Sequence, residues 1–244
     1  MENRNLPVAA LILAGGMGTR LRPITNTIPK PLVVVGNKPT IAHIIDEIVR
    51  NGINTIYVSV GYKSDRIIKY LNKYEGSAKI TYIKETSPLG TGGAVKLALK
   101  KMGYSKSDIF MVYGDDLFTL NIGEMYKLHK KEHADITITI KMSKKNKDIK
   151  NSGVVGLHGN RVIKFVEKPE LYDAPSNFIN IGKYIMNVNV YKKFPRKRIF
   201  SFEKDFVQRE IKKMSIYAYV SKGVWYPTDN IERLNTARKI WNKR

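Results

Sequence analysis

A short aliphatic run that ends in a glycine-rich turn constrains this chain more than any other feature. Val8 to Leu13 is apolar and shows no polar alternation, so it predicts a buried β-strand. Gly15, Gly16 and Gly18 follow almost at once. Because glycine lets backbone N–H groups turn toward one point and lets a bulky anion come close, this strand end predicts a phosphate site.

Two cations behind the turn strengthen that prediction. Arg20 offers a planar fork of donors and Lys30 a point charge, and both suit phosphate. The spacing excludes the P-loop, because a second glycine would have to stand at Arg20 or Leu21. It also excludes the dinucleotide fingerprint, whose third glycine would fall at Leu21. The turn therefore indicates a triphosphate site of another kind.

Strand and helix patterns alternate through the first half of the chain, which predicts an α/β fold. We expect a doubly wound, mainly parallel (Rossmann-like) mixed sheet with helices on both faces, and ligands beyond the carboxyl ends of its strands. The expected strands are Thr55–Val60, Ile80–Ile83 and Ile109–Tyr113; the expected helices cover residues 39–50, a stretch capped by Ser64 with Ile67, Ile68 and Leu71 inward, and residues 91–102 with Ala94, Leu97 and Ala98 inward.

The second half of the chain changes character, with alternating and apolar runs that predict further strands, some of them antiparallel. The expected strands are Ile136–Met142, Val154–Leu157, Val162–Val166 and Ile179–Val190, and Ile231–Trp241 is expected to form a closing helix. With no linker or internal repeat, the 244 residues predict a single domain over 1–244.

Composition limits the compartment and the partners. No apolar run reaches the ~18 residues that a membrane span needs, and no leader-like segment precedes the first strand, so we expect a cytoplasmic protein with no membrane partner. The absence of cysteine excludes disulfides and thiolate metal sites. A net charge of +22 attracts anionic substrates. The basic cluster Lys141–Lys150 contains no aromatic residue and Lys192–Arg198 contains only Phe194, which is too few for a base-stacking surface, so nucleic acid is not expected as a partner.

His129 to His133 spells H-x-x-E-H, a pattern known from zinc peptidases. On one helix His129 and His133 would share a face, but nothing nearby supplies an evident third ligand. We therefore expect this segment to be a solvated helix face and not a zinc site.

The motifs together resemble the signature of the sugar-1-phosphate nucleotidyltransferases, the nucleotide-sugar pyrophosphorylases. The resemblance covers nearly the whole chain, in the family's order. The matching segments are Leu13–Thr25, Pro29–Leu32, Gly36–Pro39, Leu89–Gly93, Gly114–Asp115, Phe165–Pro169 and Asn180–Gly182. The resemblance implies a fold of the nucleotide-diphospho-sugar transferase type, and the chain shows no hexapeptide pattern of the left-handed β-helix domain that many relatives carry at the C-terminus.

The resemblance also implies an activity: an NTP and a sugar 1-phosphate react to an NDP-sugar and pyrophosphate, with Mg²⁺ as cofactor. One sugar-phosphate oxygen attacks the α-phosphorus in line, so the site must align two polyanions and neutralise their charge. Catalytic roles are implied for Arg20, Lys30, Asp115 and Lys168; nucleotide contacts for Leu13, Ala14, Gly15, Gly16, Gly18, Thr19, Arg20, Glu85, Gly90 and Thr91; sugar-phosphate contacts for Gly114, Glu167, Lys168, Asn180 and Gly182; and metal contacts for Asp115 and Asp229.

Asp229 is the position where this chain departs from the family pattern. Relatives close with an aromatic residue followed by x-Asp-Ile-Gly, whereas here Pro227 stands at the expected aspartate and Asp229 follows two residues later. A similar Trp-x-Pro-x-Asp form occurs in the cytidylyltransferase branch, so the second metal contact is assigned to Asp229. The departure also leaves open a different class of protein, a non-catalytic subunit that binds nucleotide sugars and regulates another enzyme.

The substrate pair rests on fewer residues. A carboxylate at Glu85 can accept hydrogen bonds from N1–H and the 2-amino group of guanine, which uracil and thymine lack, so GTP is the favoured nucleotide. Overall likeness to small guanylyltransferases favours mannose 1-phosphate, and Phe200 to Phe206 resembles the heptose-1-phosphate enzymes. UTP or dTTP with glucose 1-phosphate is the alternative, and homo-oligomer formation stays open.

Overall fold

The computed structural model describes residues 6–103 and 107–241, and these fall into two compact units. We call residues 9–88, 112–120 and 223–241 the glycine-loop unit, and residues 6–8, 89–103, 107–111 and 121–222 the mixed-sheet unit. Strand β6 (Asp108–Tyr113) passes from the mixed-sheet unit into the glycine-loop unit after Met111. Each unit is therefore built from stretches that are far apart in the sequence.

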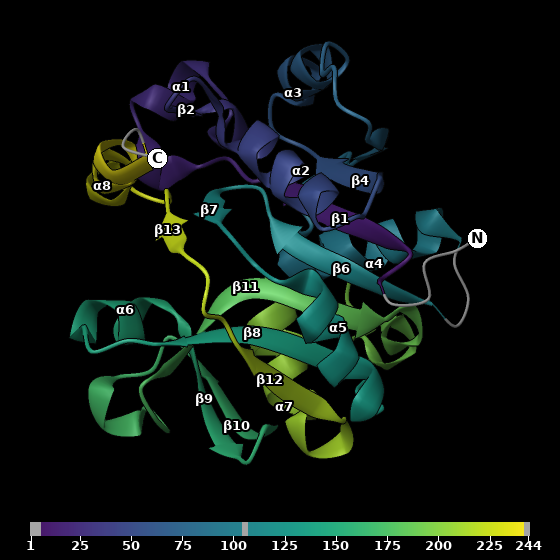
Figure 1. Cartoon of the computed structure of the whole chain (residues 1–244), viewed down its shortest axis with the longest axis vertical. Helices are drawn as coiled ribbons and strands as arrows, with labels where there is room; N and C mark the ends of the chain where they lie inside the picture. Colours follow the sequence, from purple (N-terminus) through teal and green to yellow (C-terminus); the bar gives the residue numbers. More distant parts are fainter. Residues whose placement is uncertain (1–5, 104–106, 242–244) are drawn as a thin grey trace. The chain divides into compact units, whose positions relative to one another are not determined.

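The glycine-loop unit contains a parallel run of strands in the order β5, β4, β1. Helix α2 lies in front of β1 and β4 in Figure 1 and buries an isoleucine-rich face. Its strands are β1 (Ala9–Ala14), β2 (Val34–Val35), β3 (Lys38–Pro39), β4 (Thr55–Val60), β5 (Lys79–Lys84), β7 (Asp116–Phe118) and β13 (Trp225–Pro227); its helices are η1 (Thr19–Leu21), α1 (Ile24–Thr27), η2 (Lys30–Leu32), α2 (Thr40–Arg50), α3 (Ser64–Leu71) and α8 (Ile231–Trp241).

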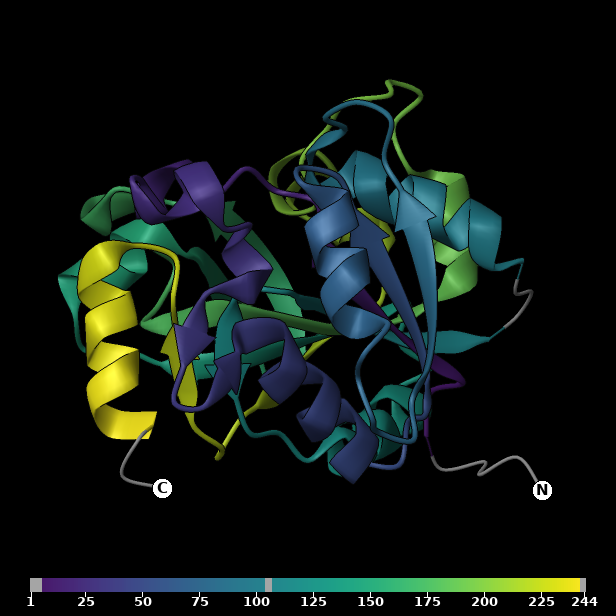
Figure 2. The ribbon, with the colours of Figure 1, turned by 90° about the horizontal axis from the view of Figure 1, so that it is seen from above.

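Helix α8 covers the segment that follows the glycine turn. It lies beside β2 (Figure 2), and its Leu234 and Ala237 share a buried cluster with Leu21, Val33 and Leu117. The apolar residues around the turn therefore form one small core with a helix that is about 200 positions away in the sequence.

The mixed-sheet unit combines both kinds of strand pairing. Strand β8 pairs antiparallel with β11 and parallel with β12, and β10 pairs antiparallel with β12 and with β9. Its strands are β8 (Ile136–Met142), β9 (Gly153–His158), β10 (Arg161–Glu167), β11 (Phe178–Asn187) and β12 (Ile216–Val220); its helices are α4 (Gly90–Met102), α5 (Ile122–Lys131), α6 (Asn146–Asn151), η3 (Leu171–Asp173), η4 (Val188–Lys193), η5 (Phe202–Val207), α7 (Gln208–Glu210) and η6 (Ile211–Lys213).

Several element predictions are confirmed and several need correction. The strand Thr55–Val60 and the closing helix Ile231–Trp241 have the expected bounds. Ser64 does not cap α3; the cap position is Lys63, in a left-handed conformation with φ of 52°. Ile68 of that helix is only partly buried, and so is Leu97 of α4, where Val95 and Leu99 are buried instead. The strand from Ile179 ends at Asn187, because the next residues form a 3-10 helix.

The H-x-x-E-H segment is not the solvated helix face that the pattern suggested. His129 is 2% exposed, with Nδ1 at 2.9 Å from Thr137 Oγ1 and Nε2 at 3.4 Å from Asp108 Oδ1. Helix α5 ends at Lys131, so His133 lies beyond the helix and does not share its face. No group of three or more His, Cys, Asp or Glu side chains that could hold a metal occurs in residues 6–103 and 107–241.

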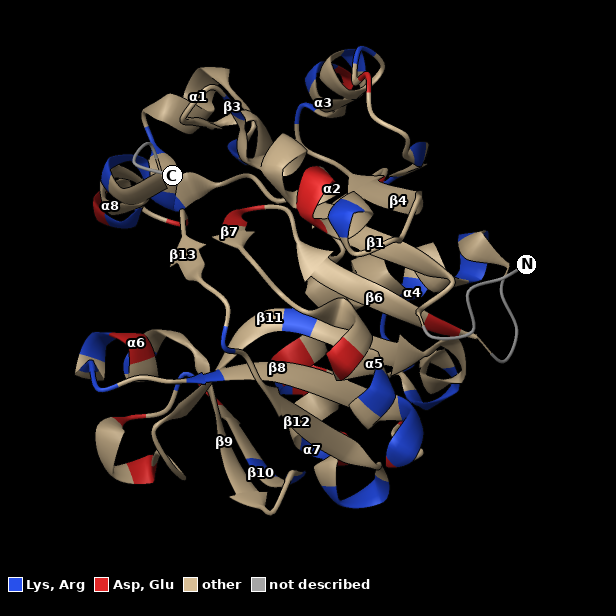
Figure 3. Ribbon diagram, in the orientation of Figure 1, with Lys and Arg blue, Asp and Glu red and all other residues tan. Residues whose placement is uncertain are grey.

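Lys and Arg occur on helices and loops of each unit and not along a single element (Figure 3). Every helix within the described ranges is too short or too polar to span a lipid bilayer.

Candidate functional site

The end of β1 meets the end of β5 at one edge of the parallel strands. The register aligns Ala14 with Val60, and Val60 with Lys84, so the residues that follow β1 and β5 emerge together. A Cβ on Gly15 would collide with the carboxylate of Glu85. Gly15 therefore leaves the space in which the Glu85 carboxylate lies against the glycine turn.

Glu85 is held in that place by its neighbours. Its backbone N–H donates to the carbonyl of Val60 at 2.8 Å, and Ser59 Oγ donates to Glu85 Oε1 at 2.9 Å. Burial raises the pKa of Glu85, and the hydrogen bond from Ser59 opposes that shift. A half-buried carboxylate beside the glycine turn is an acceptor that can distinguish one nucleobase from another.

Gly18 turns the chain toward its two cations. Its φ is 65°, and Thr25 Oγ1 donates to its carbonyl at 2.8 Å. A Cβ on Gly18 would lie 2.9 Å from Lys30 Cβ, so glycine also lets Lys30 pack under the turn. The left-handed Gly18 begins the 3-10 turn η1, which carries Thr19 and Arg20. Gly16 meets no atom within 4 Å of where its Cβ would be, so the backbone on that side is open.

Asp115 stands between β6 and β7, after Gly114, and pairs with Lys30. Its carbonyl accepts hydrogen bonds from Thr228 N at 3.2 Å and from Thr228 Oγ1 at 2.6 Å. Gly114 donates its N–H to Leu13 O at 2.9 Å, which ties Asp115 to the end of β1. The neighbouring Asp116 is buried and accepts from Trp225 Nε1 at 2.9 Å. The two aspartates thus differ, and the more exposed Asp115 is the one beside Lys30.

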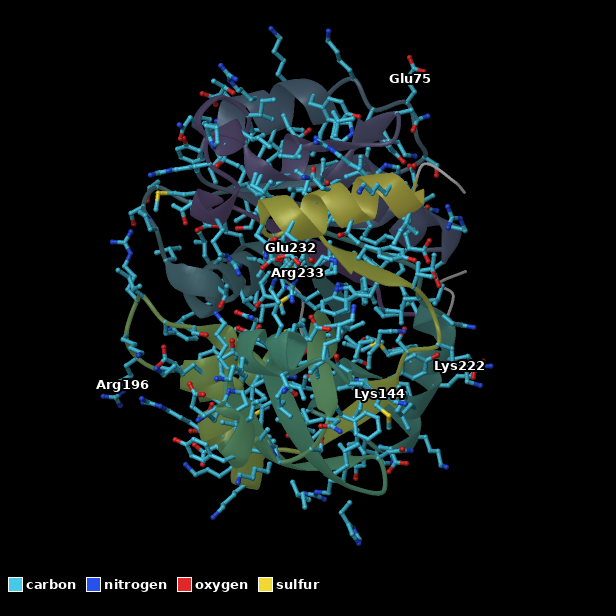
Figure 4. All side chains as sticks on the ribbon, turned by 90° about the vertical axis from the view of Figure 1, so that its left-hand side faces the viewer. Glu75, Lys144, Arg196, Lys222, Glu232 and Arg233 are labelled. Carbon is cyan, nitrogen blue, oxygen red and sulfur yellow. The ribbon has the colours of Figure 1, made fainter. Side chains whose placement is uncertain are left out.

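Asp229 joins the same unit through β13, whose Pro227 pairs with Asp116 of β7. Two arginines bind its carboxylate: Arg20 Nη1 lies 2.6 Å from Oδ2, and Arg233 Nη1 lies 3.1 Å from Oδ1. Arg233 belongs to the first turn of α8 (Figure 4). Sequence reasoning missed Arg233, although its i, i+4 spacing from Asp229 at the start of a helix was a usable signal.

The donor atoms present fit a magnesium ion better than a softer metal. Asp115 and Asp229 offer carboxylate oxygens, the hard ligands that Mg²⁺ prefers. Protein sites for Mg²⁺ commonly use one or two carboxylates and leave the other positions to water and substrate phosphates. The pair is therefore suited to an ion that arrives with a nucleotide.

In the mixed-sheet unit, the glycines around Gly90 are used for packing. Gly90 has a φ of 69°, and Gly92 N donates to Phe200 O at 2.9 Å. A Cβ on Gly92 would collide with the ring of Phe200. Thr91 Oγ1 accepts from Phe202 N at 2.9 Å and donates to Glu203 Oε2 at 3.4 Å. The segment that resembles heptose-1-phosphate enzymes thus packs on the first turn of α4.

The remaining predicted residues lie on β10 and β11 of the same unit. Asn180 and Gly182 occupy an irregular stretch of β11, where the register with β8 shifts between Asn180 and Tyr184 and Gly182 has a φ of 72°. Lys168 is exposed and left-handed, with a φ of 51°, directly after β10. Burial and the nearby charge of Glu203 raise the pKa of Glu167 to about 7, while Lys168 and Lys204 oppose the shift. Irregular strands of this kind redirect side chains toward a site.

The predicted residues therefore form two groups, one in each unit. The glycine-loop unit holds Leu13, Ala14, Gly15, Gly16, Gly18, Thr19, Arg20, Lys30, Glu85, Gly114, Asp115 and Asp229, and the mixed-sheet unit holds Gly90, Thr91, Glu167, Lys168, Asn180 and Gly182. Within the first group, contacts connect the glycine turn, both cations and both aspartates. Within the second, Thr91 bonds Glu203 and Asn180 bonds Tyr184, and Tyr184 and Glu203 bond each other; sequence reasoning singled out neither of these two partners.

The similarity to known proteins extends over the whole range that contains the predicted site residues. The model of a family described as nucleotidyl transferase matches residues 9–243. A D-glycero-alpha-D-manno-heptose 1-phosphate guanylyltransferase of Aneurinibacillus thermoaerophilus is 36% identical over 213 residues, which are 87% of this chain and 89% of that protein. The family match predicted from the motifs is confirmed.

A second relative is longer than this chain. A mannose-1-phosphate guanyltransferase of Aspergillus oryzae is 37% identical over 220 residues, which are 88% of this chain but only 59% of that protein. Among solved structures, a UDP-glucose pyrophosphorylase complexed with UDP-glucose has a TM-score of 0.84 at 23% identity and covers 98% of this chain and 99% of that one. That similarity shows the fold, a mixed sheet with helices of the nucleotide-diphospho-sugar transferase type.

Proposed function

Because this chain belongs to the nucleotidyl transferase family, we propose that it transfers a nucleotidyl group from an NTP to a sugar 1-phosphate and releases pyrophosphate. The observation that carries this proposal is the meeting of Arg20, Lys30 and Asp115 at the end of β1, beside a glycine turn. Cations and open backbone at a strand end suit a triphosphate, and a carboxylate among them suits the metal that accompanies it.

The proposed mechanism needs alignment and charge neutralisation and no side-chain nucleophile. The backbone of Gly15 to Gly18 and the guanidinium of Arg20 bind the triphosphate, and Lys30 turns from Asp115 to a phosphate oxygen. Lys168 binds the phosphate of the sugar. An oxygen of that phosphate attacks the α-phosphorus in line, so a new P–O bond forms as the bond to the β-phosphate oxygen breaks. Once on the phosphates, these cations stabilise the charge that develops on the transferred group.

Mg²⁺ is the proposed cofactor, held by Asp115 and Asp229 together with the phosphates of the nucleotide. The ion would supply Lewis-acid polarisation of the phosphoryl oxygens. Arg20 and Arg233 now bind Asp229, and Lys30 binds Asp115, so these cations are well placed to move onto phosphate oxygens when the carboxylates turn to a metal.

GTP with mannose 1-phosphate or a related sugar phosphate is the proposed substrate pair. The position of the Glu85 carboxylate over Gly15 supports guanine, whose N1–H and 2-amino group can both donate to one carboxylate. The names of the two relatives, a heptose and a mannose guanylyltransferase, support a sugar of this class. UTP or dTTP with glucose 1-phosphate is the alternative pair.

We further propose that residues 1–244 work as a single catalytic domain of doubly wound, Rossmann-like form. The family match over residues 9–243 supports a single functional assembly, although the described residues divide into two compact units. The parallel order β5, β4, β1 supports the doubly wound description for the glycine-loop unit.

A matrix of nucleoside triphosphates against sugar 1-phosphates tests the proposal. Pyrophosphate release is measured for each pair with Mg²⁺, and each reaction is repeated with EDTA or with one substrate omitted. We expect release only when NTP, sugar 1-phosphate and Mg²⁺ are all present, and fastest with GTP. Lys168→Ala serves as the internal check, because loss of the sugar-phosphate cation should greatly slow the same reaction.

The matrix also separates the catalytic proposal from a regulatory subunit. Such a subunit would bind an NDP-sugar tightly and turn over no pair in the matrix. The departure at Pro227 first suggested that class, but the contacts of Asp229 with Arg20 and Arg233 argue for a complete set of charged groups. Tight binding without turnover over the whole matrix would overturn the proposed activity.

A further inference from the structure

A chain of buried hydrogen bonds runs from Asn180 to the first turn of α4, and none of its inner members was assigned a role above. Asn180 Nδ2 donates to Tyr184 Oη at 2.6 Å, and Tyr184 Oη donates to Glu203 Oε1 at 2.8 Å. Glu203 Oε2 accepts from Thr91 Oγ1 at 3.4 Å. Two predicted substrate residues, Asn180 and Thr91, are thus connected through Tyr184 and Glu203.

The direction of each hydrogen bond follows from the chemistry of the groups. Asn180 Oδ1 accepts the N–H of Gly182 at 3.1 Å, so the amide nitrogen of Asn180 must face Tyr184 and donate. A tyrosine hydroxyl has one proton, and Tyr184 gives it to Glu203. The hydroxyl therefore accepts on one side and donates on the other, which fixes the orientation of the Asn180 side chain.

The burial of these groups makes the arrangement stiff. Tyr184 has no exposed surface, and Asn180 and Glu203 are each 8% exposed. The ring of Tyr184 packs edge-on against Phe202, with centroids 5.2 Å apart. Burial and the charge of Glu203 hold the pKa of Tyr184 well above its usual range, so the proton stays on the hydroxyl. Since buried polar groups lose much when a partner is removed, the chain of bonds resists rearrangement.

At its other end, the series of hydrogen bonds reaches Thr91, next to Gly90. Thr91 Oγ1 accepts the N–H of Phe202, the residue before Glu203, so the hydroxyl of Thr91 has its proton directed to the carboxylate. Ser201 Oγ lies 3.5 Å from the same oxygen of Glu203. Glu203 thereby connects the irregular stretch of β11 to the start of α4.

We propose that Tyr184 and Glu203 are positioning residues that hold the amide of Asn180 ready for a sugar 1-phosphate. This inference rests on the proposed function. They touch no substrate themselves; they set the rotamer of a residue that does. Their loss should therefore weaken capture of the sugar substrate more than it slows the chemical step, because the triphosphate contacts of the glycine-loop unit are left unchanged.

The test compares Tyr184→Phe with Tyr126→Phe in the full chain. Tyr126 is a matched control, because it is also buried in the mixed-sheet unit and donates to a carboxylate, Asp108, at 3.1 Å. Both variants remove one buried hydroxyl and should lower the Tm. Only Tyr184→Phe should raise the KM for sugar 1-phosphate, by roughly tenfold, with kcat at saturation within about threefold of wild type.

Glu203 supplies a second, conservative series. Glu203→Gln keeps an oxygen that accepts from Tyr184 and a nitrogen that can donate to Thr91, so its KM should lie near the wild-type value. Glu203→Ala leaves the hydroxyl of Tyr184 without that acceptor and should match Tyr184→Phe. If Tyr184→Phe does not fold, this ranking carries the test, and equal KM values for the two Glu203 variants would overturn the inference.

The outcomes separate this inference from the proposed function. Wild-type activity together with equal sugar KM values for Tyr184→Phe and Tyr126→Phe defeats the positioning role alone. A wild-type protein that forms no NDP-sugar with any pair defeats the proposed function and this inference with it.

Discussion

The two units hold their predicted site residues by different physical means. In the glycine-loop unit, Arg20 and Lys30 are paired with carboxylates, and the side chain of Arg20 is 58% exposed. In the mixed-sheet unit, Asn180 is fixed through Tyr184, which has no exposed surface. Because the Arg20 side chain is open to solvent, its ion pair can exchange partners more easily than a buried chain of hydrogen bonds can.

Under the proposed function, this difference predicts how each unit binds its substrate. The charges of the glycine-loop unit are expected to leave one another and move to phosphate and metal when a nucleotide binds. The mixed-sheet unit is expected to keep its hydrogen bonds, so that its polar groups are already oriented. One region adapts by exchange of ionic partners, and the other is preorganised.

The largest expected effect is at Asp115, the carboxylate that both pairs with Lys30 and is proposed to bind Mg²⁺. Asp115→Asn should lower kcat by about a thousandfold or more, because it removes the charge of a carboxylate that is proposed to hold the metal beside the transferred group. Asp116→Asn is the matched control, since the buried Asp116 carboxylate is bonded to the Trp225 indole. It should lower the Tm while kcat stays within about threefold of wild type. Equal activity losses in the two variants would contradict the assignment of Asp115.

Arg20 and Arg233 provide the second comparison, because both bind Asp229 but only Arg20 follows the glycine turn. Arg20→Ala should lower kcat/KM for the NTP by roughly a hundredfold to a thousandfold, the loss typical when one donor to the charge of a transition state is removed. Arg233→Ala should cost about tenfold, as an effect on the orientation of Asp229. Steady-state kinetics with varied NTP measures both, and the reverse ranking would show that the role assigned to Arg20 is wrong.

Glu85 tests whether the glycine-loop unit selects its nucleobase. Glu85→Gln should reduce the preference for GTP over UTP by roughly tenfold to a hundredfold, since a hydrogen bond to a charged group contributes about 1.5–3 kcal/mol. Ser59→Ala removes the hydroxyl that donates to Glu85 Oε1 and should give a smaller change in the same direction. Competition between the two nucleotides is the measurement, and an unchanged ratio in Glu85→Gln would move base recognition elsewhere.

The smallest expected effect is a pH dependence of stability at Glu167. Its pKa is raised from 4.5 to about 7, so the folded state binds this proton more tightly than the unfolded chain does. The stability that protonated Glu167 contributes is full below the unfolded pKa and is lost as the pH rises through about 7. The Tm of wild type should therefore fall between about pH 5 and about pH 8 relative to that of Glu167→Gln. Parallel Tm curves for the two proteins would show that Glu167 keeps an ordinary pKa.

Local patterns predicted most of the elements and, in the glycine-loop unit, the closeness of the glycine turn to its cations. The strand β1 and the glycine turn after it are determined by residues that are close together in the sequence, so a short stretch was enough to infer them. Ser64 was misjudged as a cap, because a left-handed Lys63 takes that position and sequence alone does not show the sign of φ. His129 of helix α5 was misjudged as solvated, because its partners Asp108 and Thr137 belong to the strands β6 and β8.

The inner partners of the site could not be predicted, since they depend on distant contacts. Thr91 and Glu203 are 112 positions apart and meet only when the segment at Phe200 packs on the glycines of α4. The family resemblance marks the segment Leu89–Gly93, but it does not show that the N–H of Gly92 donates to Phe200 O. Motif resemblance located Asn180 and Asp229, but only the folded chain shows what orients each of them.

The wide sequence separation within the glycine-loop unit also bears on when the site first exists. Lys30 and Asp115 are 85 positions apart, and Asp115 and Thr228 are 113 positions apart. Contacts that close such long loops are slow to form, and during synthesis a growing chain folds from its N-terminal side first. The strand β1 and the glycine turn can fold early, but Asp229 and α8 are synthesised only after more than 200 other residues. We therefore expect a nascent chain not to bind nucleotide until Asp229 and α8 have been synthesised and have folded onto the glycine-loop unit.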